Sequence, residues 1–185
     1  MTATLVTRNL RFLLWNGGSK RKQWANHLAD WLGGDVSRAV QLLQGRILPN
    51  AIELHRLADH TGRTQEDILF ANLVAEVSIL GENLRYLIDG PKRGRKKALA
   101  EALGIKPITL SRWLAGKQIP ARKHLLAMQA YFGLPAGTDL ETLPLFLELS
   151  PVGGLEQREW LHRQIDGLDE ETLRQLFPAL EKLLR

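Results

Sequence analysis

The sequence predicts an all-α protein with two tandem copies of one helical unit and a C-terminal amphipathic tail. Leu, Ala, Arg, Lys, Glu and Gln, which favour helices, dominate the 185 residues, whereas Val, Ile and Thr are sparse. Gly and Pro divide the chain into short pieces, and no long alternation of apolar and polar residues indicates a strand. The third observation is that several short sequence blocks occur twice.

The repeated blocks come in the same order in both halves of the chain. They pair residues 8–13 with 82–87, residues 28–33 with 99–104, and residues 45–49 with 116–120. Recurrence in a fixed order is typical of a duplicated structural unit. We therefore predict a first copy at residues 1–75 and a second copy at residues 76–150.

The predicted third part, residues 151–185, is a linker followed by a helical tail. Asp169, which precedes two glutamates, is a typical residue for a helix start. The helix that follows carries an apolar stripe made of Leu173, Leu176, Phe177, Leu180 and Leu184. A lone helix cannot bury such a stripe. We expect the tail to make a homodimer contact, with packing on its own domain as the alternative.

The formal net charge of +5 is unevenly distributed along the chain. Basic residues exceed acidic ones most strongly in residues 76–135, whereas residues 136–185 are acidic overall. A basic segment of this kind indicates a polyanionic partner, most commonly a nucleic acid. A merely solvated charged surface is the alternative.

Several classes of function are excluded by composition and spacing. The chain has no Cys, so it has no disulfide, thiol nucleophile or thiolate metal site. Its histidines lack metal-ligand spacing, and no phosphate-binding loop or nucleophile motif is present. We therefore predict no enzyme, with no catalytic residues, metal or cofactor. No segment approaches the roughly 18 apolar residues of a membrane span, and no signal peptide is indicated.

The second copy contains three short predicted helices with tight connections. The first, Lys96–Leu103, ends at Gly104, and the second runs from about Pro107 to Ala115 with Leu110, Trp113 and Leu114 facing inward. A third follows at Arg122–Phe132. The intervening pattern reads LAxxLGIxxxxLSRWxxGKxxP from residue 99 to residue 120.

This pattern, from about Asn83 to Leu134, resembles the lambda-repressor-like helix-turn-helix family, also called Cro-type or Xre-type. The first copy, about Leu10 to Ile68, is similar but departs from the pattern at Gly34 and Asp35. The resemblance implies a bundle of five short helices in each copy, with the third helix presented to the DNA major groove. It implies a DNA-binding transcriptional regulator, a repressor that occludes a promoter as a dimer on palindromic half-sites.

Residues expected to read bases are the outward side chains of the third helices. They are Lys106, Pro107, Ile108, Thr109 and Arg112 in the second copy, and Arg38 and Gln41 in the first. Arg can grip guanine with two hydrogen bonds, and Gln can read adenine. Expected phosphate contacts, which position rather than specify, are Arg93, Arg95, Lys96, Lys97, Lys117 and Arg122, with Arg21 and Lys22 in the first copy.

The role of the first copy stays open from the sequence. Asp35 of the first copy would be repelled by phosphates, although a carboxylate can accept from cytosine. That copy either touches DNA or has kept the fold as a packing or interaction module.

The expected partners are double-stranded DNA and a second copy of the chain, without membrane or small-molecule effector, in the cytoplasm and associated with the nucleoid. The alternative function is a protein-interaction adaptor or antitoxin-like partner. RNA binding is less supported, because no aromatic stacking platform is visible.

Overall fold

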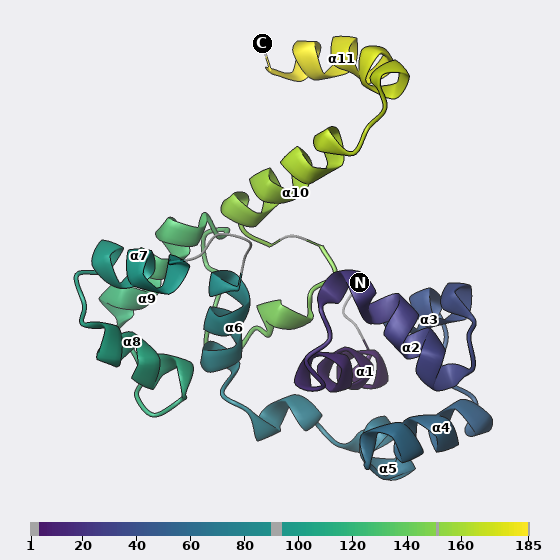
Figure 1. Cartoon of the computed structure of the whole chain (residues 1–185). Helices are drawn as coiled ribbons and strands as arrows, with labels where there is room; N and C mark the ends of the chain where they lie inside the picture. The colour runs from purple at the N-terminus through teal and green to yellow at the C-terminus, as the bar shows by residue number, and fades with distance from the viewer. Residues whose placement is uncertain (1–3, 90–93, 151, 185) are drawn as a thin grey trace. The chain divides into compact units, whose positions relative to one another are not determined.

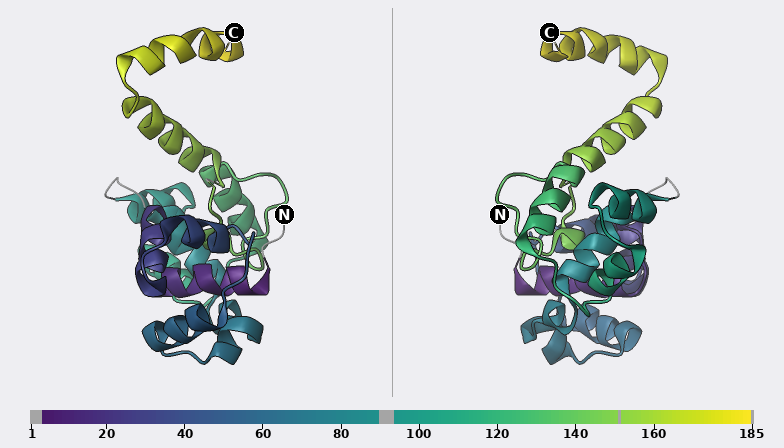
Figure 2. Two further views of the ribbon diagram at one scale, coloured as in Figure 1. Left: turned by 90° about the vertical axis from the view of Figure 1, so that its right-hand side faces the viewer. Right: turned by 90° about the vertical axis from the view of Figure 1, so that its left-hand side faces the viewer.

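The computed structural model describes residues 4–89, 94–150 and 152–184. These residues form eleven α-helices and three short 3-10 helices, and no strand occurs among them, which confirms the predicted all-α class (Figure 1, Figure 2). The helices of the first half are α1 (Leu5–Asn16), η1 (Arg21–Gln23), α2 (Trp24–Leu32), α3 (Val36–Leu43), α4 (Ala51–Thr61), α5 (Gln65–Phe70) and η2 (Leu73–Glu76). Those of the second half and tail are α6 (Ile79–Ile88), α7 (Arg95–Ala102), α8 (Pro107–Leu114), α9 (Arg122–Phe132), η3 (Leu145–Leu147), α10 (Gly154–Asp166) and α11 (Glu170–Leu184).

The chain forms two compact units. Unit 1 comprises Met1–Pro120 and Asp139–Leu149, and therefore holds α1 to α8 and η3. Unit 2 comprises Ala121–Thr138 and Ser150–Arg185, and holds α9, α10 and α11. The boundaries predicted at residues 75/76 and 150/151 stay predictions.

Helix starts in unit 1 follow from local side-chain chemistry. Asn50 and Glu53 form a capping box at the start of α4, in which each side chain bonds the backbone of the other residue. Thr64 and Asp67 form the same device at α5. The buried apolar residues of unit 1 include Leu10, Leu14, Leu28, Leu42, Leu57, Leu84 and Trp113.

In the first half of unit 1, a buried asparagine on the first helix bonds backbone groups near the end of the fifth. Asn9 on α1 is fully buried, and its Nδ2 donates to the backbone carbonyls of Ile68 at 3.0 Å and Ala71 at 2.7 Å. Its Oδ1 accepts from the Leu73 amide at 3.4 Å. These bonds satisfy three backbone groups at and just after the end of α5, two of which belong to the buried residues Ile68 and Leu73.

The second half has the same arrangement around Asn83 on α6. This side chain is also fully buried, and its Nδ2 donates to the carbonyls of Leu140 at 2.9 Å and Leu143 at 2.7 Å. Its Oδ1 accepts from the Phe146 amide at 3.3 Å. In both halves, one asparagine ties the first helix to the segment that ends the half.

An arginine two positions further along each first helix makes a second matching contact. Arg11 donates from Nε and Nη2 to the carbonyl of Leu43, at 2.9 and 2.6 Å. Arg85 donates from Nη2 to the carbonyl of Leu114 at 3.5 Å. Leu43 and Leu114 are the last residues of α3 and α8. A cation thus bonds the C-terminal end of the third helix in both halves, where the helix dipole favours positive charge.

Polar and aromatic contacts join the two halves within unit 1. Trp15 Nε1 donates to Glu82 Oε2 at 2.9 Å, and the Trp15 ring lies 5.4 Å from that of Phe146. Arg21 donates to the Tyr86 hydroxyl at 2.6 Å, and its guanidinium carbon lies 4.6 Å from the centre of the Tyr86 ring. The contact therefore combines a hydrogen bond with a cation–π interaction.

In unit 2, α10 packs against α9 through a close backbone approach. The Gly154 amide donates to the Gly133 carbonyl at 2.8 Å. A side chain at Gly153 would place its Cβ 2.6 Å from the carbonyl oxygen of Phe132, so only glycine allows this approach.

The last helix, α11, begins as the sequence predicts. Asp169 precedes it, and the Asp169 Oδ1 accepts from the Thr172 amide at 2.8 Å. Leu173 and Leu180 of the predicted stripe are half-buried, whereas Leu176 and Phe177 are exposed. The side chain of Leu184 lies outside the described part of the chain.

Candidate nucleic-acid interface

Helices α7 and α8 form a helix-turn-helix pair. α7 begins and ends one residue earlier than predicted, a difference within the usual uncertainty of helix ends. The turn requires Gly104, whose φ of 63° is a conformation that favours glycine. Pro107 then occupies the first position of α8, where its missing N–H leaves no helical bond unmade.

One face of α8 is buried and the opposite face is exposed. Leu110 and Trp113 are buried, as predicted. Lys106, Pro107, Ile108 and Arg112 are exposed and Thr109 is half-buried. Among the described residues, the side chains of Lys106 and Arg112 bond to no other side chain. Their donors are thus available to an external partner.

The predicted phosphate contacts of the second half lie in two places of unit 1. Lys96 and Lys97 are exposed in the first turn of α7, beside the half-buried Arg95. Lys97 Nζ lies 3.7 Å from Glu101 Oε1, but both side chains are largely exposed, so this ion pair is weak. Lys117, directly after α8, is also exposed.

Two further predicted contacts lie elsewhere. Arg93 is outside the described residues. Arg122 is exposed and begins α9, which belongs to unit 2.

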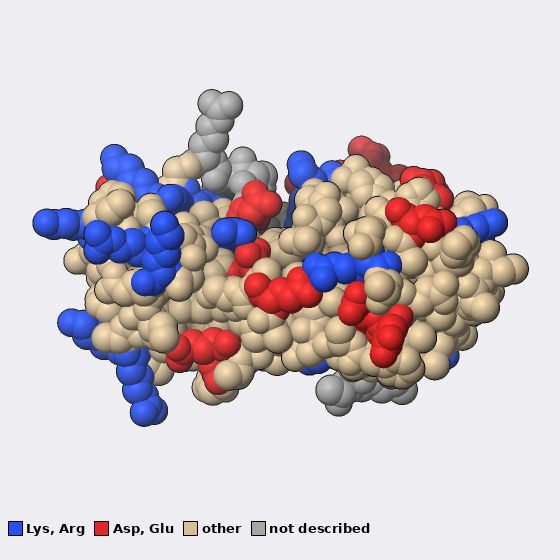
Figure 3. All heavy atoms as spheres, turned by 90° about the horizontal axis from the view of Figure 1, so that it is seen from below, with Lys and Arg blue, Asp and Glu red and all other residues tan. Residues whose placement is uncertain are grey.

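Charge is unevenly spread over the face of the molecule in Figure 3. Lys and Arg gather towards the left of this face. Acidic and basic residues alternate towards the right, on the side of α2, α3 and α4. Within unit 1, the basic segment of the sequence supplies exposed cations at Lys96, Lys97, Lys106, Arg112 and Lys117.

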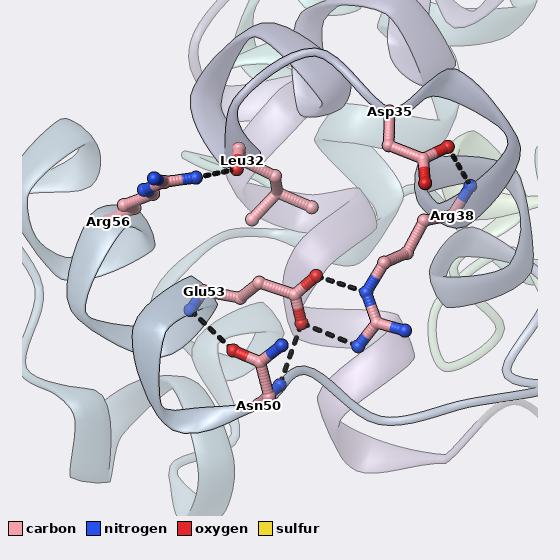
Figure 4. A network of polar contacts seen from close by, with 6 residues as sticks. All are labelled: Leu32, Asp35, Arg38, Asn50, Glu53 and Arg56. Carbon is pink, nitrogen blue, oxygen red and sulfur yellow. Dashed lines mark hydrogen bonds and ion pairs between the residues drawn. The ribbon is translucent and has the colours of Figure 1, made fainter.

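The first half places its predicted reading residues differently. Arg38 on α3 is paired with the Glu53 carboxylate on α4 through two hydrogen bonds, Nη2 to Oε2 at 2.9 Å and Nε to Oε1 (Figure 4). Glu53 is only 7% exposed and also accepts from the Asn50 amide at 2.7 Å. Asp35 caps α3, its Oδ1 accepting from the Arg38 amide at 2.9 Å. The Arg38 side chain and the backbone at the start of α3 are thus both hydrogen-bonded within the chain.

The hydrogen bonds between Arg38 and Glu53 shift the pKa of both side chains. The hydrogen bonds from Arg38 lower the pKa of Glu53, although burial opposes the effect. The carboxylate in turn raises the pKa of Arg38. The role of Arg38 as a base-reading residue stays a prediction, and its bonds to Glu53 were not anticipated from the sequence. The capping-box spacing of Asn50 and Glu53 was the available signal, since it directs this carboxylate to the start of α4.

The remaining predicted contacts of the first half are mixed. Arg21 is engaged by Tyr86, as described above. Lys22 is exposed and Gln41 half-buried. Residues with DNA-compatible chemistry are therefore present, but the two arginines are both bonded within the chain.

The residues that the structure describes also bear on membrane and metal sites. No helix there is long and apolar enough to cross a membrane. No group of three or more His, Asp or Glu side chains that could hold a metal ion occurs in the same residues.

Two short helices joined by a glycine turn, with the second exposing a polar and basic face, define a helix-turn-helix. Residues 84–137 match the family model described as helix-turn-helix. The match supports the family predicted for this segment and indicates a DNA-binding transcription regulator. It does not extend into the first half of the chain. No curated protein and no solved structure matches the chain.

Proposed function

We propose that the protein is a sequence-specific regulator that represses transcription by placing α8 in the major groove of operator DNA. One observation carries the proposal: within the segment that matches the helix-turn-helix family, α8 exposes Lys106, Ile108 and Arg112, of which Lys106 and Arg112 bond to no other described side chain.

The chemistry of this face suits base edges. Arg112 can donate two hydrogen bonds to guanine O6 and N7. Ile108 is 58% exposed, and an apolar side chain at this position can contact a thymine methyl group. Lys96 and Lys97 stand at the N-terminal turn of α7, where the helix dipole and the lysine charges both favour a phosphate.

Within this function we propose that the first half is a second copy of the same unit. Supporting observations are the matched roles of Asn9 and Asn83 and of Arg11 and Arg85. These contacts are made by buried or backbone-directed groups, which unrelated helical bundles would have no reason to share.

We also propose that α11 joins two chains in an antiparallel pair. Leu176 is 43% and Phe177 is 59% exposed on this helix. Its first turn carries Glu170 and Glu171 and its last turn carries Lys182. An antiparallel pair would cover the apolar residues, bring opposite charges together and oppose the two helix dipoles.

The dimer is tested by Phe177→Glu, with Phe70→Glu as the matched control. Both phenylalanines are exposed, but Phe70 lies on α5. Light scattering should give the monomer mass for Phe177→Glu and the dimer mass for the control. A Phe177→Glu protein with the mass of the parent would overturn the role of α11.

The DNA-binding function is tested by selecting bound sites from random duplex DNA with the full chain. We expect an inverted repeat, bound with an affinity that falls steeply with salt. Heparin should compete for binding. If no sequence is enriched and heparin does not compete, the chain is not a DNA reader and the adaptor function gains the support instead.

A further inference from the structure

We propose that each chain reads DNA with α8 alone, because contacts inside the chain have withdrawn α3 from base reading. The inference rests on the proposed function and adds to it the number of reading heads in a chain. Three observations on the first half carry it.

The first observation concerns the residue that precedes each third helix. Asp35 precedes α3 and Lys106 precedes α8. This end of a reading helix is the part that enters the groove between the phosphate backbones. A lysine there is attracted to DNA, whereas a carboxylate is repelled by it.

The second observation is that the guanidinium of Arg38 is bonded to Glu53. To reach a base, its guanidinium would have to leave a Glu53 carboxylate that is only 7% exposed (Figure 4). A buried carboxylate without its cation is strongly unfavourable. The matching positions carry other residue types, since Thr109 is third in α8, as Arg38 is in α3, and His124 is third in α9, as Glu53 is in α4.

The third observation is that Arg21, one of the two cations of the first half expected to contact phosphate, is bonded within the chain. Its guanidinium bonds the Tyr86 hydroxyl and lies over the Tyr86 ring, in the contact that joins the two halves. Arg38 and Arg21 of the first half are thus both engaged in contacts within the chain. One chain would therefore occupy one half-site, and an inverted repeat would require two chains.

Matched double variants of the full chain test this inference. The residues after the two third helices fold back alike, since the Arg46 amide bonds the Gln41 carbonyl and the Lys117 amide bonds the Arg112 carbonyl, each at 2.9 Å. The corresponding variants are therefore Gln41→Ala with Arg46→Ala, and Arg112→Ala with Lys117→Ala. Neither pair removes a core side chain, and circular dichroism checks that both proteins are folded.

Binding to the selected operator should separate the two variants. We expect the Gln41/Arg46 variant to bind within about twofold of the parent and to protect the same DNA positions from hydroxyl radicals. The Arg112/Lys117 variant should bind at least about tenfold more weakly. A comparable loss for the Gln41/Arg46 variant, or lost protection at some positions, would show that α3 reads DNA and overturn the inference. If neither variant loses affinity, the proposed function itself fails.

Discussion

The α2–α3 pair and the α7–α8 pair share a framework but differ in what their charged side chains do. Both pairs turn on a glycine with positive φ, and both third helices end on a carbonyl bonded by an arginine of the first helix. In the first pair Arg38 is bonded within the chain, whereas in the second the outward cations Lys106 and Arg112 are exposed. Under the proposed duplication, the comparison shows that buried polar contacts can be kept between two copies while their charged surface residues differ.

The largest expected effect tests the shared framework. Asn9→Ala and Asn83→Ala each remove hydrogen bonds to two carbonyls and one amide, of which one carbonyl and the amide are buried and the other carbonyl is part-buried. Each variant should lower the free energy of unfolding by about 3 kcal/mol or more. Chemical denaturation measures this, with the exposed Asn26→Ala as a control that should change it by less than about 0.5 kcal/mol. A large loss in only one half would break the proposed equivalence.

The next effect tests the reading face of the second half. Arg112→Ala should weaken binding to the selected site by about 1–3 kcal/mol and relax the preference at one base pair, because a bidentate base contact is lost. Repeating the site selection with the variant measures both changes. Binding equal to that of the parent, with an unchanged site, would show that α8 is not the reading helix.

Much of this framework could be predicted from the sequence, because helices and turns follow local rules. Helical composition gave the fold class, and Gly104, Pro107 and Gly116 gave the α7–turn–α8 pair nearly to the residue. The inward positions of Leu110 and Trp113 follow from the helical period. All these features depend on residues close together in the chain.

The contacts between residues far apart in the sequence could not be predicted in the same way. Arg21 meets Tyr86 across 65 positions, and Asn9 reaches Ile68 across 59. Such pairs depend on how helices pack, which single-sequence periodicity does not specify. Arg38 and Glu53 are only 15 positions apart, yet their pairing depends on the path of the loop between α3 and α4.

A smaller expected effect is a difference between the halves in how stability depends on pH. Arg38 lowers the folded pKa of Glu53 below the usual 4.5, so the pair stabilises the fold above that pH. This stabilisation is lost as the pH falls through the folded pKa. Arg38→Gln should therefore destabilise the protein at pH 6 and lose much of this effect at pH 3. Thr109→Ala, at the matching position of α8, should show no such pH-dependent difference. Denaturation midpoints of the three proteins at both pH values provide the measurement.

The smallest effect concerns single phosphate contacts, and it compares Lys96→Ala with Lys22→Ala. Both lysines are exposed near the start of a second helix. Because Lys96 is expected to neutralise a phosphate, its removal should weaken binding to all sequences alike and reduce the slope of log affinity against log salt by about 0.9. Removal of Lys22 should leave the slope unchanged if the first half stays off the DNA. Fluorescence anisotropy over a salt series measures both slopes. Equal reductions would place a phosphate beside each half, and the first half would then bind the backbone without reading bases.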